Sequence, residues 1–319
     1  MVVIAATIWA LNGTVSKLLL KGGFDALQLT TLRATGSFFG LLAVCAVLRP
    51  GLRRLATTRR ELPGLIIFGF LGLFMVPLLY FVAISRLPVG IGLLFEFTAP
   101  VFVALWVRFG EHQQVKRRLW VGLTLCVVGL VAVAQIWTGS LRLDPIGIAA
   151  GMSSAVLLAC YYVLGAKSVS RRDPLSLTCW AFGVAALAGA VIRPWWHFPA
   201  GVLAGSSDGV PLWLLTVYLL LLGTIVPYLL ITTAMRHLPP TSVGIIGMTE
   251  LVLATIFAWV LLHEVLSTPQ VIGGLVLLGG VILAETARAA RTDTDRENGP
   301  DTTNARVPAG VAAPDIPAT

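Results

Sequence analysis

The sequence predicts an all-α membrane protein in which ten transmembrane helices form two inverted five-helix repeats. Three observations predict this fold class: an apolar composition, long uninterrupted apolar runs, and a second half that repeats the first. Of the 319 residues, 57% are hydrophobic and 12% are charged, whereas soluble domains carry about 25% charged residues. A helix needs about 20 apolar residues to cross the hydrocarbon core. Because the runs lack the alternation of barrel strands, we expect helices to satisfy the backbone inside the bilayer.

The apolar runs place the ten spans in order along the chain. We expect them at residues 2–20, 26–48, 63–84, 89–109, 118–137, 146–166, 175–193, 212–235, 241–262 and 269–287. The first span lacks the basic flank and cleavage pattern of a signal peptide, so we expect it to be retained. The spans group into a first five-helix repeat over 1–137 and a second over 146–287. Residues 288–319 are polar and lack a sustained apolar pattern, which predicts a disordered cytoplasmic tail.

Basic residues are distributed unevenly between the predicted loops. With the N-terminus on the cytoplasmic side, fifteen Lys and Arg residues fall on that side and four on the outer side. The outer four are Lys21, Arg86, Arg142 and Arg193. Because cytoplasmic loops concentrate Lys and Arg, we expect a multi-pass protein of a bacterial plasma membrane with both termini in the cytoplasm. The same asymmetry accounts for the net charge of +8 without a nucleic-acid partner.

The two halves share an ordered set of residues. Pro77 and Pro227 each precede an arginine by nine residues, and beyond them an offset of 151 residues pairs Thr98 with Thr249. Further pairs at this offset are Val101 and Val252, Gly122 and Gly273, and Gly129 and Gly280. Because each half has an odd number of spans, the second half must be inverted relative to the first. Inverted repeats give two related packings, one open to each side, around a site at their interface.

Three charged residues fall inside predicted spans. Glu96 lies in the fourth span, Glu250 in the ninth and Arg33 in the second. A charged side chain at the bilayer centre costs on the order of 2.5–3.5 kcal/mol on insertion scales, so such residues face a cavity or a partner. The two acids either pair with Arg33 or stay protonated, and either line a cavity or make structural hydrogen bonds. Arg33 either binds a substrate carboxylate, clamps a neighbouring helix or extends to the interface.

Polar and aromatic residues also recur at helical spacing in the first span. Its Asn12 would be costly facing lipid, so this stripe should face the bundle interior. In the sixth span, Ser154 with either Tyr161 or Tyr162 repeats the pattern. The candidate substrate-binding residues are polar or aromatic side chains within spans: Trp9, Asn12, Ser16, Arg33, Tyr80, Glu96, Tyr162, Tyr228 and Glu250.

Two prolines fall in the middle of spans. Pro77 and Pro227 each remove a backbone hydrogen bond, which predicts a kink. Their symmetric placement either provides gating hinges or reflects how common proline is in membrane helices. Tyr80 and Tyr228 lie close to them in the sequence and would present hydroxyls to a ligand.

Motifs for catalysis and nucleotide binding do not occur in the sequence. The stretch from His263 to Ser267 begins like H-E-x-x-H but ends in serine, so one metal ligand is missing. The four cysteines lie in apolar runs without C-x-x-C spacing, which is typical of small core residues. We therefore expect no enzyme, no cofactor and no metal site.

Four stretches of the chain resemble the EamA-type branch of the drug/metabolite transporter superfamily. They are WALNGTVSKLL (9–19), LTTLRATGSFFG (29–40), SRLPVGIGLLFEFTAPVFVALWVRFGE (85–111) and MRHLPPTSVGIIGMTELVLATIFAWVLLHE (235–264). Arg33 matches the common second-helix arginine of that family. Glu250 matches the glutamate of its ninth-helix Glu-Pro pair, although Leu251 replaces the proline. The ordered set of stretches carries the resemblance, which covers residues 2–287.

This resemblance implies secondary export or exchange of small metabolites, often amino acids. It also implies a central cavity lined by the first four helices of each half, with the fifth and tenth helices as an outer scaffold. We therefore expect a bilayer-embedded secondary transporter of a small-molecule substrate that works by alternating access, with a proton as coupling ion at Glu250 or Glu96. Two alternatives stay open: a lipid-linked-sugar flippase, and a membrane scaffold or sensor that transports nothing.

Overall fold

The computed structural model is mostly helical, and it describes residues 2–47, 53, 55–110, 117–134, 144–169, 174–227, 230, 249–263 and 266–297. Most helices follow the 3.6-residue α period, and the segments labelled η2, η3 and η7 are π-helical. The elements in chain order are α1 (Val2–Lys21), α2 (Ala26–Val47), α3 (Leu62–Phe68), η2 (Gly69–Met75), α4 (Val76–Arg86), α5 (Val89–Glu96), α6 (Ala99–Leu105), η3 (Trp106–Gly110), α7 (Arg117–Ala134), α8 (Pro145–Val169), α9 (Pro174–Ile192), η5 (Trp195–His197), η6 (Ala200–Ala204), β1 (Ser206–Ser207), β2 (Val210–Pro211), α10 (Leu212–Leu220), η7 (Leu221–Ile225), α13 (Thr249–Leu262) and α14 (Thr268–Glu297).

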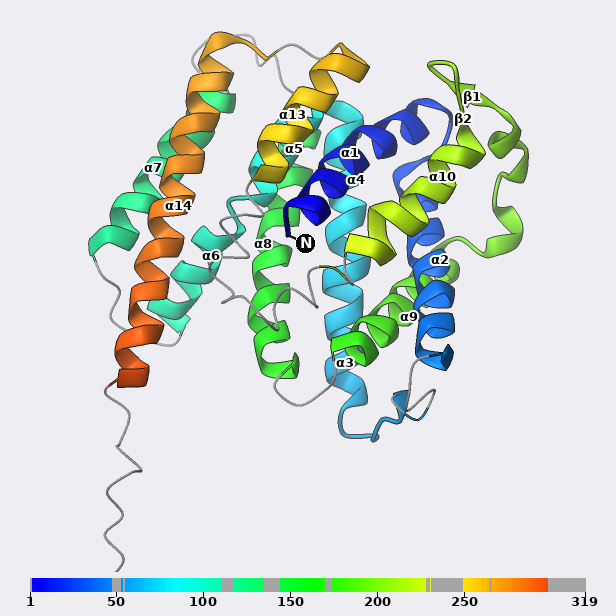
Figure 1. Cartoon of the computed structure of the whole chain (residues 1–319), viewed down its shortest axis with the longest axis horizontal. Coiled ribbons are helices and arrows are strands. Elements are labelled where there is room, and N and C mark those ends of the chain that lie inside the picture. The colour runs from blue at the N-terminus through cyan, green and yellow to red at the C-terminus, as the bar shows by residue number, and fades with distance from the viewer. Residues whose placement is uncertain are drawn as a thin grey trace, which may run out of the picture.

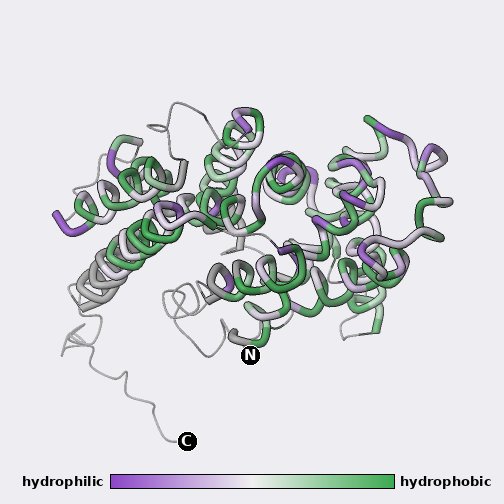
Figure 2. Tube along the Cα trace, turned by 90° about the horizontal axis from the view of Figure 1, so that it is seen from above, coloured by the Kyte–Doolittle hydropathy of each residue, from purple (hydrophilic) through white to green (hydrophobic). Residues whose placement is uncertain are grey.

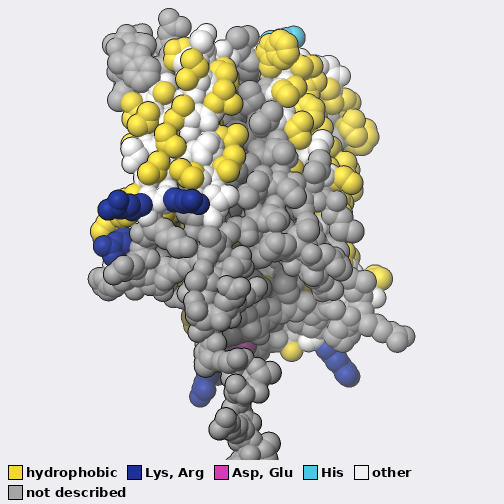
Figure 3. Space-filling model, turned by 60° about the vertical axis from the view of Figure 1, so that its left-hand side comes forward, with side chains coloured by type: hydrophobic (Ala, Val, Ile, Leu, Met, Phe, Trp, Pro, Cys, Tyr) yellow, Lys and Arg dark blue, Asp and Glu magenta, His cyan; other side chains and the backbone are white. Residues whose placement is uncertain are grey.

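The helical membrane architecture expected from the sequence is confirmed. Within the described residues, four helical stretches are long and apolar enough to cross a bilayer: Ala26–Val47, Leu62–Arg86, Val89–Gly110 and Leu175–Ile192. Shorter apolar helices cover Pro145–Tyr161, Leu212–Ile225 and Thr268–Leu283. Hydrophobic colours dominate the helical trace in Figure 2. In Figure 3, hydrophobic side chains cover the upper part of the visible face and Lys and Arg side chains lie below them.

A π-helical segment precedes each mid-span proline. The third span runs without interruption from α3 through η2 into α4, which begins just before Pro77. In the eighth span, η7 ends two residues before Pro227. Proline has no N–H to donate to the carbonyl four residues earlier, and π-helical turns are one way a helix absorbs such a disruption. The structure thus places a local change of helical period where the sequence predicted kinks.

The fourth span is broken at its centre. Helix α5 ends at Glu96 and α6 begins at Ala99, with Phe97 and Thr98 between them. Pro100 in the first turn of α6 has no N–H to donate to the carbonyl of Glu96. The backbone hydrogen bonds of α5 therefore do not continue into α6. The Thr98 hydroxyl donates to the Phe95 carbonyl at 2.6 Å and satisfies one group that the break frees. The predicted continuous helix over 89–109 is therefore two helices followed by η3.

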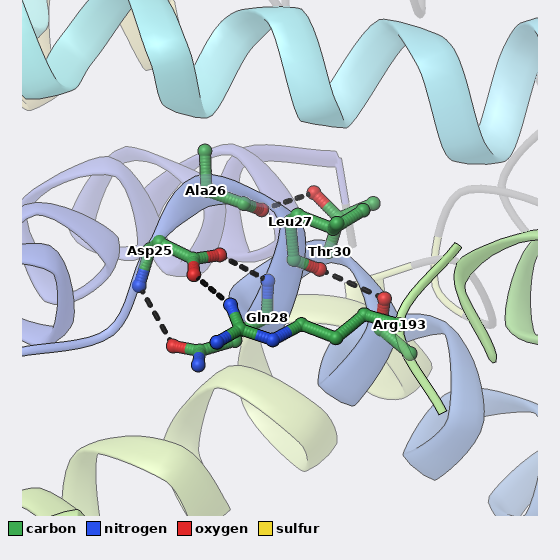
Figure 4. A network of polar contacts seen from close by, with 7 residues as sticks. Asp25, Ala26, Leu27, Gln28, Thr30 and Arg193 are labelled. Carbon is green, nitrogen blue, oxygen red and sulfur yellow. Dashed lines mark hydrogen bonds and ion pairs between the residues drawn. The ribbon is translucent and has the colours of Figure 1, made fainter. Parts of the chain in front are cut away.

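Helices α2 and α9 pack along each other and are tied together at one end (Figure 4). The N-terminus of α2 has a reciprocal cap: the Gln28 backbone N–H donates to the Asp25 carboxylate at 2.7 Å, and the Asp25 N–H donates to the Gln28 side chain at 3.0 Å. This capping box satisfies two otherwise free donors of the helix end. Arg193, just after α9, forms an ion pair with the same Asp25 carboxylate.

Helices α7 and α14 form a separate pair at the edge of the molecule (Figure 1). Their backbones approach closely at glycines. A Cβ atom at Gly129 would lie 2.5 Å from the Leu277 backbone nitrogen, and one at Gly280 would lie 2.7 Å from the Gly122 carbonyl oxygen. Close approach at small residues is the usual basis of helix packing in membranes.

The segment between α9 and α10 covers one end of the bundle with two short 3₁₀ helices and a hairpin. Strands β1 and β2 pair antiparallel, with Ser207 opposite Val210. The two turn residues, Asp208 and Gly209, have φ values of 48° and 81°, which fits the type I′ turn favoured by Asp-Gly. The Phe198 ring lies 5.8 Å from the ring of Phe24, which follows α1.

Within the described residues, three ion pairs join side chains that precede residue 137 to side chains that follow it. Lys21 pairs with Asp208 at 3.7 Å and Arg86 with Asp144 at 3.0 Å, in addition to the pair formed by Arg193. Hydrogen bonds from the Gly147 N–H and from Arg86 hold the pKa of Asp144, which precedes α8, below its usual range. Its carboxylate is therefore ionised at neutral pH and caps α8 while it binds Arg86.

Helix α14 is longer than the sequence predicted. It continues to Glu297, so residues 288–297, expected at the start of the disordered tail, are helical. Arginine and alanine, which make up half of this stretch, are strong helix formers. Residues 298–319 lie outside the described residues, as do the predicted ends of the fifth and eighth spans and the start of the ninth.

Candidate functional site

A polar group inside the bundle centres on Arg33 of α2. Its Nε donates a hydrogen bond to the Thr224 hydroxyl of η7 at 3.1 Å. Thr224 in turn donates to the Leu219 carbonyl at 2.9 Å, five residues earlier. Because η7 is π-helical, a hydroxyl five residues later reaches that carbonyl. The second half of the chain thus holds the guanidinium of the first half in place.

Two glutamates from different halves extend this polar group beyond the arginine. Glu96, the last residue of α5, accepts a hydrogen bond from the Ser154 hydroxyl of α8 at 3.0 Å. It interacts electrostatically with Arg33 on one side and with Glu250 of α13 on the other. All three charged side chains are half-buried rather than sealed. One guanidinium and two carboxyl groups are therefore linked electrostatically within the bundle through Glu96.

The polar stripe of α1 faces the interior, as expected. Asn12 and Ser16 are buried, and the Asn12 Oδ1 and Ser16 Oγ atoms have no hydrogen-bond partner within the described part of the chain. A Cβ atom at Gly223 would overlap the Asn12 side chain, which places Asn12 beside the residue preceding Thr224. Buried polar atoms normally have partners, so these two atoms retain unused hydrogen-bonding capacity inside the bundle.

The aromatic candidates are placed only in part. Trp9 is half-buried on α1. Tyr80 is buried on α4, where its hydroxyl would lie 3.0 Å from a Cβ atom at Gly13 of α1. Tyr162 belongs to α8, but its side chain lies outside the described residues, and so does Tyr228.

Two residues that make polar contacts in the site were not among the substrate-binding residues predicted from the sequence. Thr224 was not singled out, and Ser154 was noted only as part of a stripe. A hydroxyl within an apolar run was the available signal, and it is weak because Ser and Thr are common in membrane helices. Among the residues that the structure describes, no group of three or more His, Cys, Asp or Glu side chains is arranged to hold a metal ion.

Comparison with protein families identifies the class of protein to which this chain belongs. A model described as the EamA-like transporter family matches residues 1–135 and again residues 145–286. This chain belongs to the EamA-like transporter family. Its polar group therefore lies in a family of membrane transporters, which are not enzymes.

Related proteins agree with this assignment. The transporter is 30% identical over 275 residues to an uncharacterized transporter of Archaeoglobus fulgidus, covering 86% of this chain and 92% of the relative. It is 26% identical over 245 residues to the threonine/homoserine exporter RhtA of Escherichia coli K12, covering 77% and 76%. A solved crystal structure superimposes with a TM-score of 0.61 at 21% identity, covering 91% of this chain and 96% of that one, and it supports the fold.

Proposed function

We propose that this protein is a plasma-membrane secondary transporter that exports or exchanges small metabolites such as amino acids by alternating access. The single observation that carries the proposal is the polar group of Arg33, Glu96 and Glu250, which is built from both halves inside a membrane transporter. Charged groups within spans are retained at a cost and mark substrate or ion pathways.

Reciprocal contacts between the halves support an inverted ten-helix repeat. At the α7–α14 pair, Gly129 meets Gly273 and Leu277, while Gly280 meets Gly122 and Cys126. The offset of 151 residues relates Gly122, Cys126 and Gly129 of α7 to Gly273, Leu277 and Gly280 of α14. Two-fold related packing of this kind is expected when two copies of one unit face each other.

The chemistry of the site suits a zwitterion. Arg33 offers a planar cation for a carboxylate, and the two glutamates offer partners for an ammonium group. Threonine and homoserine, named for the exporter RhtA, carry both groups. The buried polar atoms of Asn12 and Ser16 provide further hydrogen-bonding capacity on α1.

A proton is the coupling ion that this site favours. Two carboxylates that interact electrostatically ionise together only at a cost, so the pair readily holds one proton. Replacing both Glu96 and Glu250 by Gln should abolish substrate flux driven by a pH gradient in proteoliposomes. Substrate counterflow, which needs no net proton movement, should persist at a reduced rate.

The matched control for this experiment is Glu61→Gln, because Glu61 is an exposed carboxylate before α3. Flux in this variant should equal that of the wild type. Unchanged pH-driven flux in the double variant would exclude the two glutamates as coupling groups. Absence of any flux or counterflow with amino acids, amines and nucleosides in the wild type would contradict the transport function itself.

A further inference from the structure

An apolar groove lies between α1 and α10, and Arg33, Glu96 and Glu250 are not among the residues that line it. It has a cavity volume of about 480 Å³. One wall is a single face of α1, formed by Leu11, Thr14, Val15 and Leu18 at helical spacing. The other wall is formed by α10 and η7, and Leu261 of α13 also borders the groove. The groove thus follows a seam where the first half meets the second.

The groove is open along its length and apolar on its rim. Its exposed lining residues are Leu214, Val217, Leu221, Leu222 and Leu261, each more than a third exposed. These helices belong to a membrane transporter, so the medium around the rim is acyl chains. An open apolar channel within the bilayer takes an apolar chain, because water would find no partners on these walls.

The two ends of the groove differ in polarity. At the inner end the Tyr218 hydroxyl donates to the Ile8 carbonyl at 3.0 Å. At the outer end Asp208 lines the groove and forms an ion pair with Lys21. The type I′ turn of the hairpin fixes Asp208 at this position. A molecule that fits this groove therefore has a long apolar part and a polar end that carries one positive and one negative charge.

A buried hydroxyl lies between these two ends. Thr14 lines the groove and is fully buried, and its Oγ1 has no hydrogen-bond partner among the described residues. Its own helix offers the carbonyl of Ala10 as the usual acceptor for a threonine, yet no such bond forms within the described contacts. Because this oxygen is enclosed by protein atoms, the hydroxyl is part of the wall and does not contact an occupant of the groove.

We propose that this groove binds one acyl chain of a zwitterionic glycerophospholipid from the outer leaflet. The phosphate lies beside Lys21 and the ammonium of an ethanolamine headgroup lies beside Asp208. From Leu11 to Lys21 the helix rises about 15 Å, which matches half of the roughly 30 Å hydrocarbon core.

Photo-cross-linking of the full-length protein tests this site. The protein is placed in nanodiscs of phosphatidylcholine that contain a small fraction of phosphatidylethanolamine with a diazirine in the acyl chain. After irradiation, peptide mass spectrometry locates the adducts. We expect them on α1 and on α10–η7 at several times the yield found on the exposed face of α9. Adducts spread over all lipid-facing helices in proportion to their exposure would overturn the proposal.

Paired substitutions then separate the groove from the general surface. Leu214→Trp with Leu222→Trp should fill the groove and reduce adducts on α1 at least fivefold. Leu187→Trp, at a similarly exposed position on α9, should leave them unchanged.

Lys21→Gln, or a phosphatidylglycerol probe, should reduce the yield severalfold, and equal yields would overturn the headgroup assignment. An intermolecular disulfide through Leu222→Cys would show a second copy in the groove and would also overturn it. The readout is binding, so it stands apart from any test of transport.

Discussion

At the residue scale, the orientation of Arg33 depends on one hydroxyl from the other half of the chain. The Thr224 side chain accepts from Arg33 Nε and donates to the Leu219 carbonyl. The guanidinium group of arginine is planar and rigid, so a hydrogen bond that fixes Nε also fixes the direction of the two terminal nitrogens. Thr224 is therefore a positioning residue for the cation that we assign to the substrate carboxylate.

Replacing Thr224 by valine should weaken substrate binding. The change keeps the shape of the side chain but removes the acceptor of Arg33. Hydrogen bonds to charged groups contribute about 1.5–3 kcal/mol, so we expect KM for transport to rise roughly tenfold or more. Thr216→Val on α10 is the control, because the Thr216 hydroxyl is buried without a hydrogen-bond partner in the described residues. Equal KM values for the two variants would remove Thr224 from the site.

The sequence singles out the charged residues of the candidate site more clearly than the hydroxyls of Thr224 and Ser154. Arg33, Glu96 and Glu250 interrupt apolar runs, and the cost of burying a charge makes each one conspicuous. Thr224 and Ser154 also lie in apolar runs, but a hydroxyl can bond to a carbonyl of its own helix and needs no special surroundings. Only the packing of η7 and α8 against the charged residues gives these hydroxyls a role.

At the element scale, the positions of the apolar helices were predictable, and the break in the fourth span was not. The apolar run over the fourth span continues through Phe97, so hydrophobicity alone predicts one helix. The break between α5 and α6 depends on Pro100, and mid-helix prolines have more than one outcome. At Pro77 the chain instead continues through η2 into α4. The end of α14 was misplaced for another reason, since helix formers extend it past the apolar segment.

The α7–α14 pair offers a sharp test at this scale. A Cβ atom at Gly280 would lie 2.8 Å from the Cys126 backbone nitrogen, whereas one at the adjacent Gly279 would meet nothing within 4 Å. We expect Gly280→Ala to destabilise the protein by about 1–3 kcal/mol, because the backbones must separate. Gly279→Ala should be neutral or stabilising by up to about 1 kcal/mol from helix propensity. Thermal unfolding in detergent measures both, and equal melting temperatures would contradict the packing.

At the scale of the whole molecule, the ion pairs between the halves lie on one side. Lys21–Asp208, Arg86–Asp144 and Arg193–Asp25 all involve segments that the sequence places outside the membrane. The hairpin and the Phe24–Phe198 contact lie among the same segments. Ser16, in the outer part of α1, is fully buried beneath them. In the proposed alternating-access cycle and the predicted orientation, this arrangement corresponds to a state closed to the outside.

Breaking these pairs should therefore favour the state open to the outside. Each pair is exposed and contributes little alone, so the effect should appear when Asp25, Asp144 and Asp208 are all replaced by Asn. In a background without native cysteines, Ser16→Cys should react severalfold faster with a membrane-impermeant maleimide added outside. High salt should accelerate labelling of the parent protein in the same direction, because it screens exposed charges. Labelling that is insensitive to both changes would show that these pairs do not close the outer side.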